Sequence, residues 1–274
     1  SVLILLLCIF TITTRGQEKP TDISNHWAQD YIINMVNKEI MKTYDDNTFK
    51  PDQPITRGEF TVALAKLLYL NPVNTNYFSD LNSYYGKKYI NTLAKKNIIS
   101  GYPDGTFRPN KNLSRAETIA TLIKALGIRK EEEIINLEKY NPYEDISKDY
   151  WGAEEIKIGR KLGIIADNSD IFKARAFTTR GEAARYLSKI SNMNGVTGYI
   201  TDIYPTSNKI SVNSTDGERQ VYDIKENSLI GRNNRLVGID EILKTDKVFI
   251  IADENKDLRY LKAYGMITQE DLAT

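Results

Sequence analysis

The sequence predicts a chain of the α+β class in two parts, a mainly helical region built from repeats and a small all-β barrel after it. Two observations lead to this prediction. A five-residue phrase occurs three times, as Ile55-Thr56-Arg57-Gly58-Glu59, Leu113-Ser114-Arg115-Ala116-Glu117 and Thr178-Thr179-Arg180-Gly181-Glu182. After Met193 the hydrophobic pattern changes from helical to alternating. Repeats of this kind usually bury their apolar faces against one another.

The first element is an apolar run from Val2 to Ile12, which is too short to span a membrane but suits a secretory leader. We expect residues 1–16 to be such a leader. Its Cys8 is the single cysteine, so the mature chain would have neither disulfides nor a thiol site. Attachment of a lipid at Cys8 is the alternative role for that residue.

The repeats are expected to divide the chain at 17–72, 73–137 and 138–193, with the barrel at 194–274. The arginines of the phrase lie 58 residues apart (57 to 115) and then 65 apart (115 to 180). An aspartate lies 35 residues before each of them, at Asp22, Asp80 and Asp145. The extra residues of the second interval fall at 129–141, where the acidic run 131–133 favours a solvated connector.

Each repeat is predicted to be a helix, a structured loop and a second helix. In copy two, apolar residues at helical spacing run from Tyr85 to Ile98. The stretch from Ser100 to Pro109 is rich in turn residues. The second helix starts at Ser114 and ends near Gly127. Copy one has the same order, but the loop of copy three, at 167–174, has lost its glycine and proline.

The repeated phrase has the form Ser/Thr-x-x-Glu, which is the capping box that opens a helix. We therefore interpret its hydroxyl and carboxylate residues as structural helix caps. These are Thr56 with Glu59, Ser114 with Glu117, and Thr179 with Glu182.

The arginine of each phrase needs another explanation, because the helix dipole disfavours a cation in the first turn. A guanidinium beside free helix N-terminal amides would form a site for a carboxylate or phosphate. The alternative is an internal bridge to the aspartate of the same copy, at Asp22, Asp80 or Asp145.

These motifs carry a family resemblance. Residues 19–193 resemble three consecutive S-layer homology (SLH) domains, whose hallmarks are the early aspartate, the loop Gly101-Tyr102-Pro103-Asp104-Gly105-Thr106-Phe107 and the arginine phrase. Copy one departs from the pattern at Thr43, where glycine is usual. The resemblance implies a pseudo-threefold helical bundle that holds a secreted protein non-covalently to an acidic cell-wall polysaccharide, typically one ending in a pyruvylated amino sugar.

The resemblance also implies the site. Arg57, Arg115 and Arg180 would bind the polysaccharide, together with Gly101, Tyr102 and Asp104 of the loop. Only copy two keeps the complete loop, so we expect Arg115 to contribute most. The aromatic residues at the starts of the first helices, Trp27, Tyr85 and Trp151, are predicted to pack in the core, with stacking on a sugar ring as the alternative.

The C-terminal part alternates in the manner of strands, and the predicted strands are 196–203, 210–212, 221–224, 247–251 and 258–264. A hairpin is expected at Thr215-Asp216-Gly217 and a helical turn at 239–243. This pattern favours a small closed barrel, similar to barrels appended to bacterial wall proteins or to a five-stranded OB-like barrel. We expect a spacer or assembly role and leave its ligand open.

Composition argues against an enzyme and against nucleic acid. The net charge is +1, from 37 basic and 36 acidic residues, so no whole-chain field attracts a polyanion. The single histidine, His26, is expected to cap or stack, and Asp45, Asp46 and Asp104 belong to turns. We therefore expect no catalytic residue, no metal and no cofactor.

The prediction is a secreted module at the wall or surface of a bacterium, without an integral membrane span in its mature chain. Its expected partner is an acidic, pyruvylated cell-wall polysaccharide. The alternative is an envelope scaffold or S-layer-type assembly protein that binds peptidoglycan or a protein partner.

Overall fold

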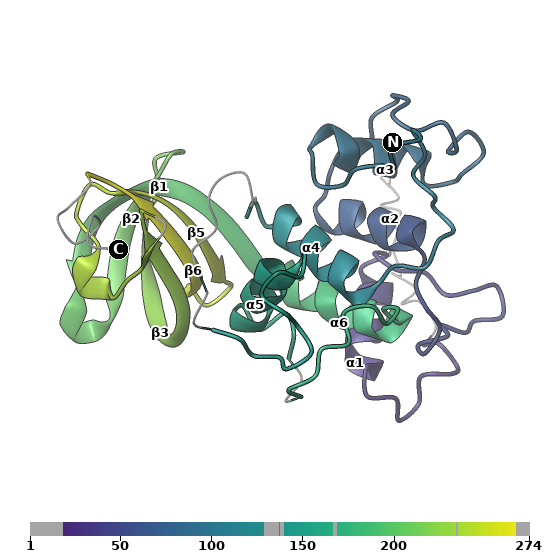
Figure 1. The fold of residues 1–274 in the computed structure, drawn as a ribbon, viewed down its shortest axis with the longest axis horizontal. Coiled ribbons are helices and arrows are strands. Elements are labelled where there is room, and N and C mark those ends of the chain that lie inside the picture. The colour runs from purple at the N-terminus through teal and green to yellow at the C-terminus, as the bar shows by residue number, and fades with distance from the viewer. Residues whose placement is uncertain (1–18, 129–136, 138–139, 167–168, 234, 267–274) are drawn as a thin grey trace, which may run out of the picture.

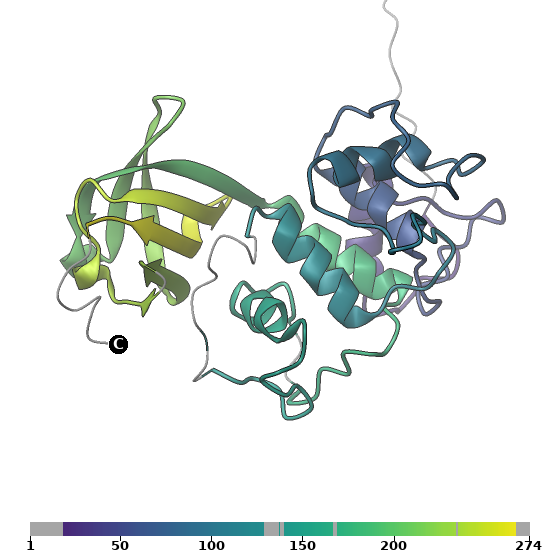
Figure 2. The ribbon, with the colours of Figure 1, turned by 45° about the horizontal axis from the view of Figure 1, so that its top comes forward.

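The computed structural model describes residues 19–128, 137, 140–166, 169–233 and 235–266. The expected leader, Cys8 and the acidic run 131–133 lie outside these residues, as does the start of the copy-three loop at 167–168. Within the described residues, a helical bundle and a β-barrel lie side by side along the long axis of the molecule (Figures 1 and 2). The predicted α+β class with two parts is therefore confirmed.

The described helices come in pairs, one pair for each repeat. They are α1 (Gln29–Asn37) and α2 (Arg57–Leu67), α3 (Lys87–Lys95) and α4 (Arg115–Ala125), and α5 (Ala153–Lys161) and α6 (Arg180–Ser191). The first helix of copy two begins at Lys87 rather than Tyr85. Its N-cap Gly86 has non-helical dihedrals, and the Lys87 N–H donates to the Tyr84 carbonyl to close a turn.

The second helix of each copy packs against the first helix of the next copy. The contacting pairs are α2 with α3, α4 with α5, and α6 with α1. This order is cyclic, so copy three closes back onto copy one. At the centre the closure is a ring of backbone hydrogen bonds: Ile55 N–H to the Thr178 carbonyl (2.9 Å), Thr178 N–H to that of Leu113 (2.9 Å), and Leu113 N–H to that of Ile55 (3.1 Å). The bundle is therefore pseudo-threefold.

The barrel is built from β1 (Met193–Tyr204), β2 (Lys209–Ser214), β3 (Arg219–Arg232), β5 (Lys247–Asp253) and β6 (Asp257–Tyr264). The strands follow one another as β1–β2–β3–β6–β5, and β5 pairs with β1 to close the barrel. Only β3 and β6 are parallel among these pairs. The two-residue strand β4 (Arg235–Leu236) extends the edge of β3.

The predicted strands all appear, together with the hairpin turn, where Gly217 has φ +94°. The expected helical turn is the short 3-10 helix η3 (Ile239–Glu241). One bound is wrong, because β3 continues to Arg232 instead of ending at Ile224. The polar run Lys225-Glu226-Asn227-Ser228 interrupts the alternation that a sequence pattern would follow.

Bundle and barrel share an apolar boundary. The main hydrophobic cluster of the bundle includes Leu229, Ile251 and Tyr260 of the barrel, and Phe249 packs against it. A second cluster fills the interior of the barrel, with Ile210, Val248 and Leu261 fully buried. The two parts are not separated by an extended linker at the expected boundary, because Asn194 and Gly195 of β1 pair with Ala252 and Ile251 of β5.

Candidate functional site

Each arginine of the repeated phrase contacts the loop of the next copy rather than its own. The Nε atom of Arg57 donates to the Phe107 carbonyl of copy two at 3.1 Å. Arg115 donates in the same way to Phe172 of copy three (2.8 Å), and Arg180 to Phe49 of copy one (2.7 Å). Each guanidinium also lies over the ring of that phenylalanine. The three arginines therefore lie at three seams between copies.

The early aspartates do not bridge to the arginines, so the alternative of an internal Arg–Asp pair is wrong. Each carboxylate accepts two backbone N–H groups from the loop of its own copy. Asp22 binds the N–H groups of Phe49 and Lys50, both at 2.7 Å. Asp80 and Asp145 hold the other two loops in the same way. The aspartate thus fixes the phenylalanine whose carbonyl receives the arginine of the preceding copy.

The helix N-termini are closed, so the expected site at free helix amides is also wrong. All three capping boxes are present, with the hydroxyl accepting from the N–H of the glutamate. The N–H groups of Arg57 and Gly58 donate to the Lys111 and Pro109 carbonyls, each at 2.8 Å, and the other two helices repeat this. These first-turn N–H groups are therefore not open to a ligand, and the polar groups that face each seam are side chains.

The residue after each arginine is small because another copy packs directly on it. A Cβ atom on Gly58 would collide with the Tyr84 ring and lie 2.9 Å from the Pro109 side chain. At the equivalent Gly181 the neighbour is His26. His26 accepts a hydrogen bond from the Ala28 N–H and lies 3.2 Å from Asp52, which makes it a residue of the seam between copies three and one.

The Arg180 seam contains a cavity of about 360 Å³, which we call the Arg180 cavity. Arg180 is only 4% exposed. Its Nη1 pairs with Glu59 at 3.0 Å, and its Nη2 donates to the Lys42 carbonyl at 2.9 Å. The lining residues come from the copy-one loop, α2 and the start of the copy-two helix: Ile40, Met41, Lys42, Thr43, Tyr44, Glu59, Val62, Ala63, Lys66, Tyr85, Tyr89 and Arg180.

Charge in the Arg180 cavity is predominantly positive. Arg180, Lys42 and Lys66 line it against the single carboxylate of Glu59. Burial lowers the pKa of Lys66, and the neighbouring Lys42 lowers it further. Burial raises the pKa of Tyr44 although Arg180 opposes this. The cavity therefore combines cationic side chains with tyrosine rings.

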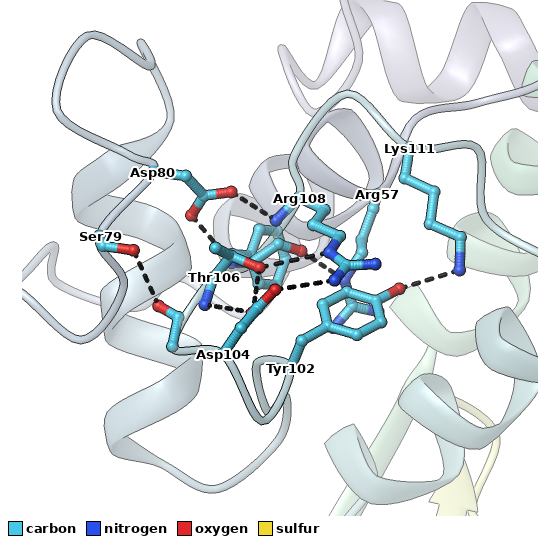
Figure 3. A network of polar contacts seen from close by, with 10 residues as sticks. Arg57, Ser79, Asp80, Tyr102, Asp104, Thr106, Arg108 and Lys111 are labelled. Carbon is cyan, nitrogen blue, oxygen red and sulfur yellow. Dashed lines mark hydrogen bonds and ion pairs between the residues drawn. The ribbon is translucent and has the colours of Figure 1, made fainter.

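The Arg57 seam brings Arg57 together with the predicted loop residues Tyr102 and Asp104 (Figure 3). Arg57 donates to the Ser100 carbonyl at 2.6 Å and lies 5.6 Å from the centre of the Tyr102 ring. The Tyr102 hydroxyl accepts from Lys111 at 2.9 Å, and Arg108 lies over its ring at 4.0 Å. Burial lowers the pKa of Arg57, against the attraction of nearby Tyr102 and Glu117.

Gly101 and Asp104 shape this loop. A Cβ atom on Gly101 would lie 2.7 Å from the Thr106 carbonyl and would collide with the Phe78 ring. Asp104 accepts from the Thr106 N–H (3.0 Å), the Thr106 hydroxyl (2.6 Å) and Arg108 (2.8 Å). The hydrogen bonds from Thr106 and Arg108 lower the pKa of Asp104 to about 2. Its carboxylate is thus engaged within its own turn.

The Arg115 seam is filled. Arg115 pairs with Glu182, and Tyr186 is completely buried at the position that Ala63 and Thr121 hold in the other copies. The complete loop of copy two therefore lines the seam of Arg57, and Arg115 faces the altered loop of copy three. The reason for expecting Arg115 to contribute most is wrong, because the arginine and its loop come from different copies.

The aromatic residues at the helix starts are exposed, so their predicted core packing is wrong. Trp27 is 53% exposed, Tyr85 71% and Trp151 52%. Tyr85 lines the Arg180 cavity, and Trp27 lies under Arg185, whose guanidinium is 5.1 Å from the ring. All three rings therefore lie at the surface of the bundle and not in its core.

Sequence reasoning missed Lys42, Lys66 and Tyr89. The sequence contained one signal for Lys66, since a lysine follows the arginine of each repeated phrase by nine residues, at Lys66, Lys124 and Lys189. No group of three or more His, Cys, Asp or Glu side chains suited to a metal ion occurs in the part of the chain that the structure describes. Among those same residues no helix has the length and apolar character needed to cross a membrane.

Comparison with known proteins gives three matches to one domain family. The profile of the S-layer homology domain matches residues 21–61, 77–119 and 142–184. An S-layer protein of Bacillus anthracis is 27% identical over 199 residues, which is 70% of this chain and 22% of that protein. A cellulosome-anchoring protein of Acetivibrio thermocellus is 33% identical over 142 residues, 49% of this chain and 30% of that protein.

An enzyme carries a similar region. An exoglucanase of Acetivibrio thermocellus is 32% identical over 171 residues, 60% of this chain and 15% of the exoglucanase. The chain thus spans less than a third of the length of each of these relatives.

Proposed function

Because the chain carries three tandem S-layer homology domains, we propose that it anchors a surface protein to the bacterial cell wall by binding an acidic polysaccharide. The module would be secreted and would act at the wall. A pyruvylated amino sugar is the proposed recognition unit, since its ketal carboxylate is a compact anion beside a ring that can stack. The similarity to a protein named as a cellulosome-anchoring protein supports an anchoring function.

The observation that carries the proposal is the Arg180 cavity. Its three cations face one carboxylate, so a bound carboxylate would improve the local charge balance. Lys42 is exposed and can turn towards a ligand. Lys66 is half-buried, and its Nζ donates to the Glu39 carbonyl at 2.9 Å, which leaves two further N–H groups for a ligand while Arg180 holds the seam. Tyr44, Tyr85 and Tyr89 offer faces for the sugar ring.

The Arg57 seam is the second proposed contact. Arg57 and Tyr102 would bind there, with Lys111 beside them, while Gly101 and Asp104 hold the loop in shape. Arg115 is proposed as the weakest of the three arginines, because Glu182 pairs with it and Tyr186 fills its seam. We propose no catalytic role for this chain. The match to the exoglucanase covers only 15% of that enzyme.

The test is co-sedimentation of the chain with purified cell walls. Lys42→Ala combined with Lys66→Ala should weaken binding roughly tenfold to a hundredfold, since each lost charge-assisted contact costs about 1.5–3 kcal/mol and neighbouring contacts are not additive. Lys247→Ala, an exposed barrel residue, is the matched control. Walls stripped of pyruvate should bind the unaltered chain as poorly as native walls bind the double variant.

Equal binding to stripped and native walls would reject the acidic ligand. The envelope-scaffold alternative would then gain support if the chain still bound isolated peptidoglycan or another wall protein.

A further inference from the structure

A second cavity lies where the barrel meets the helical bundle, and we call it the barrel cleft. Its volume is about 360 Å³. Strand β1 begins at Met193, two residues after α6 ends at Ser191, and Met193 pairs with Asp253 at the end of β5. This pairing fixes the β5–β6 turn beside the last turn of α6. The lining residues are Tyr31, Leu162, Gly163, Ser188, Lys189, Asn192, Met193, Asp253, Glu254, Asn255 and Arg259.

The barrel cleft is the outer end of the third seam. Tyr31 and Lys189 hold the positions that Tyr89 and Lys66 hold at the Arg180 cavity. Tyr186 fills the inner end of this seam, as described above. Barrel residues form one wall of this cleft, whereas no barrel residue lines the Arg180 cavity.

The barrel wall of the cleft is held rigidly. One oxygen of Asp253 accepts the N–H groups of Asn255 and Asp257, both at 3.0 Å, and the other accepts from Arg259 at 2.7 Å. Burial opposes ionisation of Asp253, but Arg259 and the turn N–H groups outweigh burial and lower its pKa. The carboxylate is thus ionised, paired and used to shape the turn that presents Glu254 and Asn255.

The charges of the two cavities differ. Lys189 and Arg259 in the barrel cleft balance Asp253 and Glu254, whereas three cations face one carboxylate in the Arg180 cavity. A charged ligand gains no net attraction from a balanced lining. The cleft is therefore suited to an uncharged ligand.

The remaining polar groups of the cleft both donate and accept hydrogen bonds. Ser188 accepts from Asn34 at 3.0 Å, which leaves its own O–H to donate. The Asn192 carbonyl oxygen accepts from Ser191, which directs the amide NH₂ elsewhere. Asn255 adds a second amide, and Tyr31 adds an aromatic ring. Such a set matches hydroxyl and acetamido groups, which also donate and accept.

We propose that the barrel cleft is a second carbohydrate site, which takes an uncharged sugar of the N-acetylhexosamine class. Asn192 and Asn255 bind its hydroxyl or acetamido groups, and Tyr31 packs on its ring. The barrel thereby acquires a binding role that the helical repeats alone do not supply.

The experiment is calorimetric titration of the full chain with tri-N-acetylchitotriose, an uncharged oligosaccharide. Asn192→Ala combined with Asn255→Ala should weaken binding about tenfold, as expected for two lost neutral hydrogen bonds. Both residues are exposed, and an unchanged melting curve of the variant verifies its fold. Lys42→Ala combined with Lys66→Ala is the matched control and should leave this affinity unchanged.

Absence of saturable binding, or affinity unaffected by the asparagine variant, would overturn the proposal. Loss of binding in the lysine variant would also overturn it, because the sugar would then occupy the Arg180 cavity. Titration of the unaltered chain and of the asparagine variant with purified peptidoglycan glycan and with the acidic cell-wall polysaccharide distinguishes two sources of such a sugar, because only a source that enters the cleft loses affinity in the variant. Wall binding through the Arg180 cavity is measured separately, so either site can fail alone.

Discussion

At the scale of residues, members of the repeated phrase act within their own helix and across a seam. Glu59 shows this most clearly: its Oε2 closes the capping box with Thr56, and its Oε1 pairs with Arg180 of another copy. Helix capping alone would not require arginine beside the cap. The seam requires it, because the guanidinium reaches a carbonyl, a carboxylate and a ring at once.

Arg180→Ala should destabilise the fold by about 3 kcal/mol, since it leaves the Phe49 and Lys42 carbonyls and the Glu59 carboxylate without their buried partner. Urea unfolding measures this loss. Lys42→Ala, which removes an exposed cation of the same cavity, should leave the midpoint almost unchanged. If Arg180→Ala and Lys42→Ala had similar urea midpoints, Arg180 would contribute to ligand binding and not to stability.

Glu59→Ala should cost more stability than Glu117→Ala, although both remove a capping box worth about 0.5–2 kcal/mol. Glu59 also pairs with buried Arg180 at 3.0 Å, whereas Glu117 lies 3.9 Å from the exposed Lys111. Thermal unfolding of the two variants makes the comparison. An equal loss would show that the Arg180 pair contributes nothing beyond the cap.

At the scale of elements, the main helix–helix contacts join neighbouring copies. Helix α2 packs on α3, α4 on α5, and α6 on α1, so no copy covers its own apolar faces. The loop of each copy also supplies the carbonyls that satisfy a helix N-terminus of the preceding copy. Cooperation between copies is therefore built into both the core and the backbone hydrogen bonds.

The fragment 73–137, which is copy two alone, should remain unfolded. It would expose the faces of α3 and α4 that contact α2 and α5, and two short helices are only marginally stable without tertiary packing. Circular dichroism should show little helix and no sharp thermal transition. A cooperative transition like that of the full chain would contradict the cyclic dependence of the copies.

At the scale of the whole molecule, the barrel and the bundle share one hydrophobic cluster. Leu229, Ile251 and Tyr260 belong to the main bundle cluster, and Phe249 packs against it. The barrel is therefore packed against the bundle and not joined to it through the chain alone. It also provides one wall of the barrel cleft.

Deletion of residues 195–274 should leave wall binding through the Arg180 cavity largely intact but lower the melting temperature. The Arg180 cavity has no barrel residue in its lining, whereas the exposed boundary loses apolar contacts. A loss on the order of 2 kcal/mol corresponds to a fall of about 4–8 °C for a domain of this size. Differential scanning calorimetry measures the melting temperature, and co-sedimentation at about 20 °C measures wall binding. The two measurements separate the effect on stability from the effect on binding.

An unchanged melting temperature would mean that the apolar boundary contributes little. A large loss of wall binding by a truncated chain that still folds would show that the barrel supplies part of the anchoring site.

The sequence by itself determined the repeats, the helix–loop–helix order, the capping boxes and the strands of the barrel. These features depend on contacts within short windows: an apolar residue every three or four positions, a hydroxyl three residues before a glutamate, or a glycine in a tight turn. The end of β3 was missed because polar residues 225–228 interrupt its pattern.

Only the tertiary structure decided which arginine meets which loop. Arg180 binds the carbonyl of Phe49, 131 residues away, and the same cyclic shift sends Arg57 to the loop of copy two. Three nearly equal copies give no local signal for this shift, because each loop could in principle receive its own arginine. The packing of α6 on α1 and the central ring of hydrogen bonds select the exchanged arrangement, and this selection leaves one seam open, one lined by the complete loop and one filled by Tyr186.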